Sequence, residues 1–130
     1  MANPNIVDVA TIKGGNFGWN LSTGLTTTLI EVTGSDVIVK LNRVTCTNVD
    51  GSAAADLDLF VSGLGTGAVD GVTATGGDSD VYLAKTISVP ADASLVVLDT
   101  PIYLKEGDLL KGGASAAGDL DLFISFDVIS

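Results

Sequence analysis

Paired aspartates are the residues in this chain whose type and spacing could do chemistry. Closely spaced carboxylates are typical ligands of calcium, which takes about six to eight oxygen atoms. Two of the pairs alternate with leucines, as expected on the solvent face of a strand. The pair in the glycine-rich span, near Asp70, is the better candidate, but it lacks the Asp-x-Asp-x-Asp-Gly spacing of an EF-hand loop. We therefore predict no metal or cofactor site, and leave calcium binding in the 70–80 loop open. The pairs are Asp56 with Asp58, Asp119 with Asp121, and Asp78 with Asp80.

The residue types that most enzymes need are scarce. The chain has no histidine, which excludes serine–histidine and cysteine–histidine catalysis within the chain and removes the commonest transition-metal ligand. Two carboxylates can cleave a glycosidic bond, but sugar clefts normally carry aromatic platforms, and only 5% of the residues are aromatic. The glycine-rich stretch Gly63–Gly67 is followed by no nearby lysine, so it does not fit a phosphate-binding loop. The sequence thus predicts that the protein is not an enzyme.

Composition indicates a single domain whose apolar surface is covered by another protein molecule or by a large partner. A chain of 130 residues is long enough to bury one core and too short for two ordinary domains. Hydrophobic residues make up 46% and charged residues 17% of the chain, so we expect an oligomer or a protein docked on something large. Sixteen acidic and six basic residues give a formal net charge of −10. Binding to nucleic acid through neutralised phosphates is therefore not expected.

Few residues of the chain indicate a cellular compartment. The single cysteine, Cys46, lies in an alternating stretch and is predicted to be a small buried apolar residue. The segment Met1–Asn5 has neither the basic region nor the apolar core of a signal peptide, and no apolar run is long enough to span a bilayer. We expect a protein that is made in a cytoplasm and is not anchored to a membrane.

A short sequence motif, which we call the repeated phrase, occurs twice in the chain and has the alternating pattern of a β-strand. Asp56–Ser62 reads DLDLFVS, and Asp119–Ser125 reads DLDLFIS. In an extended chain, alternate side chains point to opposite faces. Each copy therefore has one apolar face of leucines and a second face with two aspartates and then a phenylalanine. The pattern leaves open whether the two copies are neighbours in one sheet or equivalents in two.

Alternation and β-branched residues continue along nearly the whole chain, with no apolar period of a helix. We predict an all-β fold, an antiparallel β-sandwich that is jelly-roll-like, as one domain over 1–130 with 1–12 as an extended N-terminal arm or an edge strand. Turns are expected at Gly14–Asn16 and over 62–80, and a hairpin at Pro101–Leu110 around a polar turn. The predicted strands are Asn5–Ile12, Leu25–Thr33, Asp36–Val49, Asp56–Val61, Val81–Val89, Ser94–Leu98, Pro101–Leu104, Asp108–Gly112 and Asp119–Ile129.

Three aromatic residues are candidates for an interface. Trp19 follows Asn16–Gly18 in an expected turn, where it either plugs the core or an edge or contacts a partner, since tryptophan is enriched at interface centres. Phe60 and Phe123 lie on the otherwise polar faces of the two repeated strands. Each phenylalanine is therefore expected to face either a second layer of the sandwich or a neighbouring subunit.

Five stretches spread over nearly the whole chain resemble a family of small virion structural proteins of marine tailed phages, including cyanophages. The motifs are β-structural and not catalytic. The chain departs from the family pattern at Lys13–Asn16, and also in the last strand at Phe126–Val128. The stretches are Met1–Val7, Thr47–Gly51, Val89–Leu98, Pro101–Asp108 and Ile129–Ser130.

The resemblance implies a capsid decoration, or cement, protein on the outer surface of the phage head. Such a protein would bind the major capsid protein, stabilise the shell, and associate with itself, with a homotrimer as the expected form. An acidic body would lie outside the shell, away from packaged DNA, and the segment 2–12 would be able to add a strand to a neighbour. The alternatives are a neck, tail or fibre component, and a module that binds a host-surface glycan through its loops.

Overall fold

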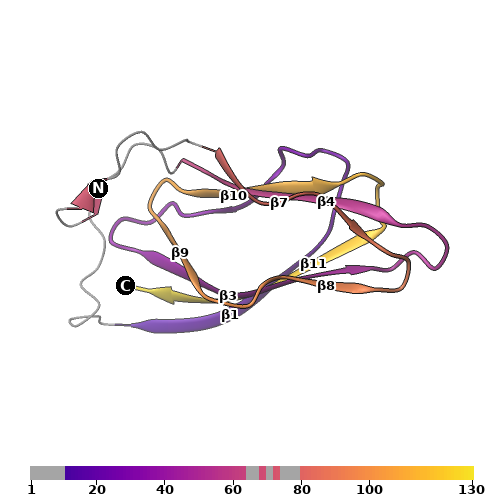
Figure 1. The fold of residues 1–130 in the computed structure, drawn as a ribbon. Coiled ribbons are helices and arrows are strands. Elements are labelled where there is room, and N and C mark those ends of the chain that lie inside the picture. Colours follow the sequence, from indigo (N-terminus) through magenta and orange to yellow (C-terminus); the bar gives the residue numbers. More distant parts are fainter. Residues whose placement is uncertain (1–10, 64–67, 70–71, 74–79) are drawn as a thin grey trace.

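The computed structural model describes residues 11–63, 68–69, 72–73 and 80–130. It confirms the predicted fold class, because strands form two antiparallel sheets that pack face to face (Figure 1). The described residues include no helix long and apolar enough to cross a membrane. The strands are β1 (Ile12–Asn20), β2 (Thr28–Glu31), β3 (Ile38–Asn48), β4 (Ala55–Ser62), β5 (Ala68–Val69), β6 (Val72–Thr73), β7 (Asp80–Val89), β8 (Ser94–Leu98), β9 (Ile102–Lys105), β10 (Leu109–Ala114) and β11 (Leu120–Ile129).

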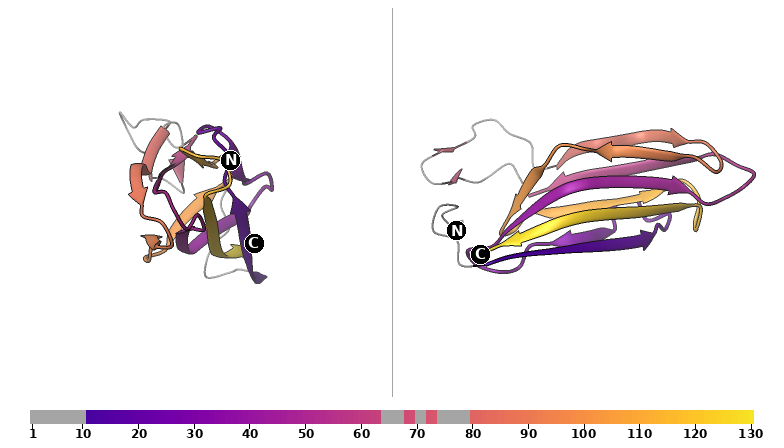
Figure 2. Two further views of the ribbon diagram at one scale, coloured as in Figure 1. Left: turned by 90° about the vertical axis from the view of Figure 1, so that its right-hand side faces the viewer. Right: turned by 90° about the horizontal axis from the view of Figure 1, so that it is seen from below.

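The first sheet has the order β1-β11-β3-β8, with β9 also paired to β3, and the second has the order β2-β10-β4-β7. Within the described residues, β5 and β6 form a separate pair. The chain passes from one sheet to the other at most of its connections. In the right-hand view of Figure 2 the molecule is seen from the side of the first sheet, with β1 along one edge.

The core fills the space between the sheets with side chains that alternate along each strand. Leu57 and Leu59 of β4 and Leu122 and Ile124 of β11 are all fully buried and belong to one core cluster. The two copies of the repeated phrase therefore lie in opposing sheets, each flanked by strands on both sides. This answers the question that the sequence pattern left open: the copies are equivalents in two sheets.

The expected turn at Gly14–Asn16 was wrong, because these residues lie in the middle of β1. β1 pairs with β11 over its whole length, from Ile12 opposite Ile129 to Asn20 opposite Asp121. Its glycines fit beside large neighbours: a Cβ on Gly15 would lie 2.9 Å from Cζ of Phe126. β1 lies at the edge of the first sheet, but it shares only Ile12 with the predicted strand Asn5–Ile12 and with the predicted arm or edge strand over 1–12. Residues 1–10, the rest of the predicted arm, lie outside the described residues.

The predicted hairpin at Pro101–Leu110 was also wrong. β9 pairs with β3 in the first sheet, whereas β10 pairs with β4 and β2 in the second. The turn between them carries the chain across the sandwich, and the buried carboxylate of Asp108 holds it. Asp108 accepts hydrogen bonds from the backbone N–H of Lys105 at 2.9 Å and from its Nζ at 3.3 Å. Pro101, which has no N–H to donate, separates β8 from β9 along β3.

Candidate interaction surface

The three predicted interface aromatics have different surroundings. Phe123 lies on the outer face of the first sheet with 51% of its surface exposed. Trp19 is half-buried at the edge of the same sheet and packs against the core. Phe60 has only 4% of its surface exposed. The structure thus brings Trp19 and Phe123 together at one edge and leaves Phe60 on the other sheet.

Phe60 is covered by its own chain. It lies in β4, in the interior of the second sheet, between Lys111 of β10 and Tyr82 of β7. Its ring centroid is 5.0 Å from that of Tyr82. The Nζ of Lys85 lies 4.8 Å from the centroid of the same tyrosine ring, a cation–π geometry. Of the two predicted settings, the structure does not show the second layer of the sandwich, because Phe60 is absent from the core cluster between the sheets and is covered by residues of its own sheet.

Trp19 belongs to a strand and not to the expected turn. On β1 it lies opposite Leu122, and Phe17 lies opposite Ile124, so both rings point to the core side of the edge strand. Phe17 stacks on Phe126 at 4.5 Å between ring centroids and meets Trp19 edge-on at 5.7 Å. The alternation of aromatic residues with glycines in this segment was the signal for a strand, and its glycine content masked that signal.

The outer face of the first sheet is built in rows that run across the strands. In the Phe123 row, Gly18 of β1 lies opposite Phe123, which lies opposite Thr45 of β3, which lies opposite Val96 of β8. Val96 has 45% of its surface exposed. Two exposed apolar side chains, a threonine and a glycine thus form one nearly uncharged row.

Three further rows belong to this face, and we call the four rows together the first-sheet outer face. In the Asp121 row, Asn20 Nδ2 donates to Asp121 Oδ1 at 2.7 Å, and the Thr47 and Ser94 hydroxyls are 2.9 Å apart. The rows are the Asp121 row (Asn20, Asp121, Thr47, Ser94), the Ser125 row (Asn16, Ser125, Arg43) and the Asp127 row (Gly14, Asp127, Lys40, Tyr103). Beyond the Asp127 row the strand pairing continues with a fifth row, Ile12, Ile129, Ile38 and Lys105.

Charge on the first-sheet outer face sums to zero, although the whole chain carries −10. Its two acids, Asp121 and Asp127, are on β11, and its two bases, Lys40 and Arg43, are on β3. Within the described part of the chain the one ion pair is Lys105 with Asp108. Sequence reasoning did not identify Val96 and Tyr103 as part of this surface, although the alternation in Ser94–Leu98 carries a signal for Val96.

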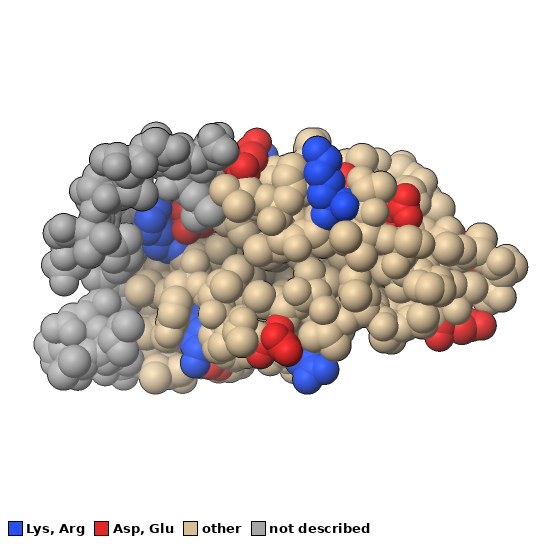
Figure 3. Space-filling view, viewed as in Figure 1, with Lys and Arg blue, Asp and Glu red and all other residues tan. Residues whose placement is uncertain are grey.

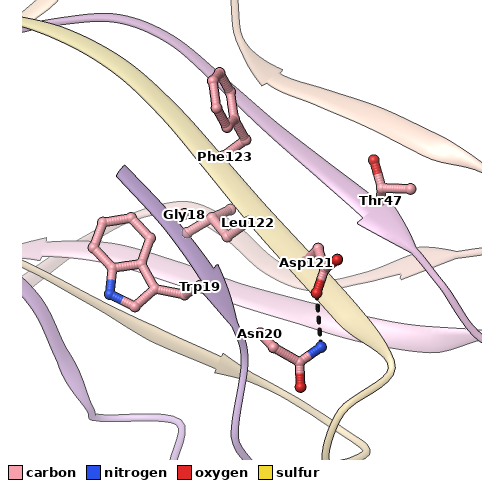
Figure 4. A pocket seen from close by; sticks show the side chains of 7 residues that line it. All are labelled: Gly18, Trp19, Asn20, Thr47, Asp121, Leu122 and Phe123. Carbon is pink, nitrogen blue, oxygen red and sulfur yellow. Dashed lines mark hydrogen bonds between the residues drawn. The ribbon is translucent and has the colours of Figure 1, made fainter. Parts of the chain in front are cut away.

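A groove of about 490 Å³ lies where this face meets the edge of the sheet (Figure 4). Gly18 leaves it open, because a Cβ there would meet only the Leu122 carbonyl oxygen, at 3.8 Å. Figure 4 shows the Phe123 and Trp19 rings projecting to different sides of the paired strands, with the Asn20–Asp121 hydrogen bond between β1 and β11. The lining residues are Gly18, Trp19, Asn20, Thr47, Asp121, Leu122 and Phe123.

One aspartate of each strand pair holds a neighbouring strand through a hydrogen bond. Asp58 Oδ1 accepts a hydrogen bond from the N–H of Thr86 at 2.7 Å, while Asp121 accepts one from Asn20. The described residues contain no group of three histidine, cysteine or acidic residues placed to hold a metal ion. Asp70 and Asp78 lie outside the described residues, so the 70–80 loop stays untested.

Cys46 is buried in the core beneath the first-sheet outer face, as predicted. Burial, and secondarily the negative charge of Asp121, raise the pKa of its thiol to about 11. A thiol with a raised pKa is mostly protonated near neutral pH and is a poor nucleophile. Its role here is packing.

Comparison with known proteins assigns the chain to no family. No protein-family model matches the chain, and no curated protein matches it. One solved structure with detectable similarity is the crystal structure of the infectious bursal disease virus VP2 subviral particle, at 15% identity and a TM-score of 0.39. The match covers 92% of this chain and 32% of that one, so this chain spans about a third of the length of its structural neighbour.

Proposed function

We propose that this protein is a structural component of a tailed-phage virion, and specifically a decoration protein on the outer surface of the head. The observation that carries the proposal is the first-sheet outer face, where Phe123, Val96 and Tyr103 are exposed on a surface without net charge. An exposed apolar patch of this kind marks a contact with another macromolecule. The resemblance of the sequence to small phage virion proteins favours a virion protein as that macromolecule, either the major capsid protein or a further copy of this chain.

The architecture supports the proposal. The order β1-β11-β3-β8 facing β2-β10-β4-β7, with the chain crossing between sheets, favours assignment to the jelly rolls, an architecture used by many viral capsid domains. A fold does not specify a role, so this is an analogy. A two-sheet body with a continuous core does meet the mechanical need of a protein that reinforces a shell.

Charge supports an external position. The net charge of −10 disfavours contact with packaged DNA. In Figure 3, acidic and basic side chains are scattered and most of the visible surface belongs to other residues. We propose the major capsid protein and further copies of this chain as the partners. The proposed role is structural and not enzymatic, with no cofactor and no membrane contact.

Electron cryomicroscopy of the intact virion tests this proposal. Fitting the chain into the map should place many copies on the outer shell, at threefold or quasi-threefold points. Quantitative mass spectrometry of separated heads and tails provides the control, because a decoration protein must appear in the head fraction in proportion to the major capsid protein. Density confined to the neck, tail or fibres would overturn the decoration role. If the chain is absent from the particle, a glycan-binding module becomes the favoured function.

A further inference from the structure

We infer that the first-sheet outer face binds a second copy of itself, face to face, about a twofold axis that runs along the strands between β11 and β3. In a twofold interface each contact occurs twice, with the two residues exchanged between copies. This axis would place β11 of one copy over β3 of the other, and β1 over the β8–β9 edge. The inference goes beyond the proposed function, because it concerns a contact that exists whether or not the protein binds a capsid.

Charge complementarity is the first argument. Because Asp127 and Lys40 are register partners on neighbouring strands, the axis sets Asp127 of one copy against Lys40 of the other, twice. Ser125 is likewise set against Arg43, and Asp121 against Thr47. Neither Lys40 nor Arg43 forms an ion pair with a described residue of its own chain. Acids along one strand and bases along the next give this face complementary charge toward a second copy, most directly at Asp127 and Lys40.

Size complementarity is the second, independent argument. In the Phe123 row the axis sets Gly18 against Val96 of the other copy, and Phe123 against Thr45. In the Asp127 row it sets Gly14 against Tyr103, which has 53% of its surface exposed. Val96 and Tyr103 thus meet glycines of the other copy, and Phe123 meets the smaller Thr45. Packed sheets cross at about 30°. Residues of β11 and β3, the strands next to the axis, are displaced least by this crossing and therefore stay opposite their partners in the other copy.

The area of the face sets the expected strength. Four strands at about 4.8 Å spacing and four rows along them cover on the order of 400 Å² of flat sheet in each copy. A standard interface buries about 800 Å² per partner. We therefore expect weak pairing, with a Kd in the micromolar range, which many copies held close together would strengthen.

Sedimentation velocity of the full chain from about 10 µM to about 1 mM, a range chosen for weak interfaces, tests the pairing. The wild type should pass from one copy to two as concentration rises. Gly18→Trp should weaken pairing by about tenfold or more, because the ring occupies the space of Val96 of the partner copy. The monomer should tolerate this change, since Gly18 faces open space. Ile87→Asp, at an exposed apolar position on the second sheet, is the matched control and should leave the pairing unchanged.

Reversing the charges at positions 40 and 127 provides a second test, which does not require the folded monomer to accommodate a tryptophan at position 18. Lys40→Glu and Asp127→Lys should each weaken pairing, by roughly tenfold for close charge pairs, and the double variant should restore most of it. Thermal unfolding of each variant separates loss of pairing from loss of fold.

Three outcomes overturn the inference. They are a wild type that stays monomeric at the highest concentration, one that forms three copies, and pairing that Gly18→Trp leaves unchanged. If the wild type stays monomeric and the Phe123→Asp variant no longer binds phage heads, the first-sheet outer face binds the capsid protein instead. Failure of the proposed function is distinguishable, because it is read from the position of the chain on the virion and not from its mass in solution.

Discussion

Asn48 Nδ2 donates a hydrogen bond to the carbonyl oxygen of Val89 at 2.8 Å, and this bond joins β3 of the first sheet to β7 of the second. The same nitrogen donates to the Ala53 carbonyl at 2.9 Å, and Oδ1 accepts from the N–H of Asp50 at 2.9 Å. Asn48 is one of two buried polar residues in the described part of the chain. One fully hydrogen-bonded amide therefore ties the two sheets together at the end of the sandwich.

Asn48→Leu should lower the free energy of unfolding by about 2–4 kcal/mol, because it leaves two carbonyls and one N–H without partners at a buried site. Urea unfolding followed by tryptophan fluorescence measures this loss. Asn20→Ala is the matched control: it removes two hydrogen bonds from an exposed amide and should cost less than about 1 kcal/mol. Equal losses in the two variants would contradict a special role for Asn48.

Thr86 has a φ of 52°, a left-handed conformation that β-branched residues rarely adopt. It lies on β7 where the pairing with β4 shifts register, and its N–H donates to Asp58. Thr86→Gly should raise the free energy of unfolding by about 1 kcal/mol, since glycine accepts this φ without strain. Asp58→Ala should lower it by a similar amount, because the N–H of Thr86 then loses its acceptor. Thermal melts of both variants test the pair, and destabilisation by Thr86→Gly would show that the threonine is not strained.

Gly15 and Gly18 are close in sequence but should respond oppositely to the addition of a methyl group. A Cβ at Gly15 would press on the Phe126 ring at 2.9 Å, whereas one at Gly18 would meet only a carbonyl oxygen at 3.8 Å. Gly15→Ala should therefore cost about 1–3 kcal/mol, as overpacking does. Gly18→Ala should be neutral or stabilising by up to about 1 kcal/mol, because alanine restricts the unfolded chain. Chemical unfolding compares the two, and a neutral Gly15→Ala would contradict the packing seen between β1 and β11.

The repeated phrase allowed the core residues of two strands to be predicted from the sequence. Alternation placed Leu57, Leu59 and Leu122 in the core, and the structure confirms each of them. The pattern is local, however, and strand pairing is not. Nothing local distinguishes a hairpin at Pro101–Leu110 from a turn that crosses between sheets, because both need an apolar run, a polar turn and another apolar run. The crossing is fixed by the distant partners of β9 and β10.

The candidate surface was less predictable for the same reason. Phe60 and Phe123 occupy equivalent positions in the two copies of the phrase, yet one is covered and the other is exposed. The difference comes from their cross-strand neighbours, since Phe60 faces Tyr82 across the strands and Phe123 faces Gly18. Trp19 was misplaced because glycines usually mark turns, whereas in β1 they make room for aromatic rings.

Cys46 should make the stability of the protein depend on pH in the alkaline range. Its pKa is about 11 in the folded chain, against 9.0 for an ordinary thiol, because of burial and the charge of Asp121. Between these values the unfolded chain has lost the thiol proton and the folded chain has kept it, so the unfolded state binds fewer protons and stability falls as pH rises. This contribution is fully present below pH 9 and is lost as pH rises toward 11, by an amount on the order of 2–3 kcal/mol.

Urea unfolding of the wild type and of Cys46→Ala at pH 8 and at pH 10.5 measures this effect. High pH also changes the stability of both proteins in ways that do not involve the thiol, so the informative quantity is the change in the difference between the two proteins. The wild type should lose more stability than Cys46→Ala on going to the higher pH, and at pH 8 its thiol should react with iodoacetamide only at the rate of unfolding. An identical pH response of the two proteins, or rapid alkylation of the native protein, would show that the thiol is not held in its neutral form by burial.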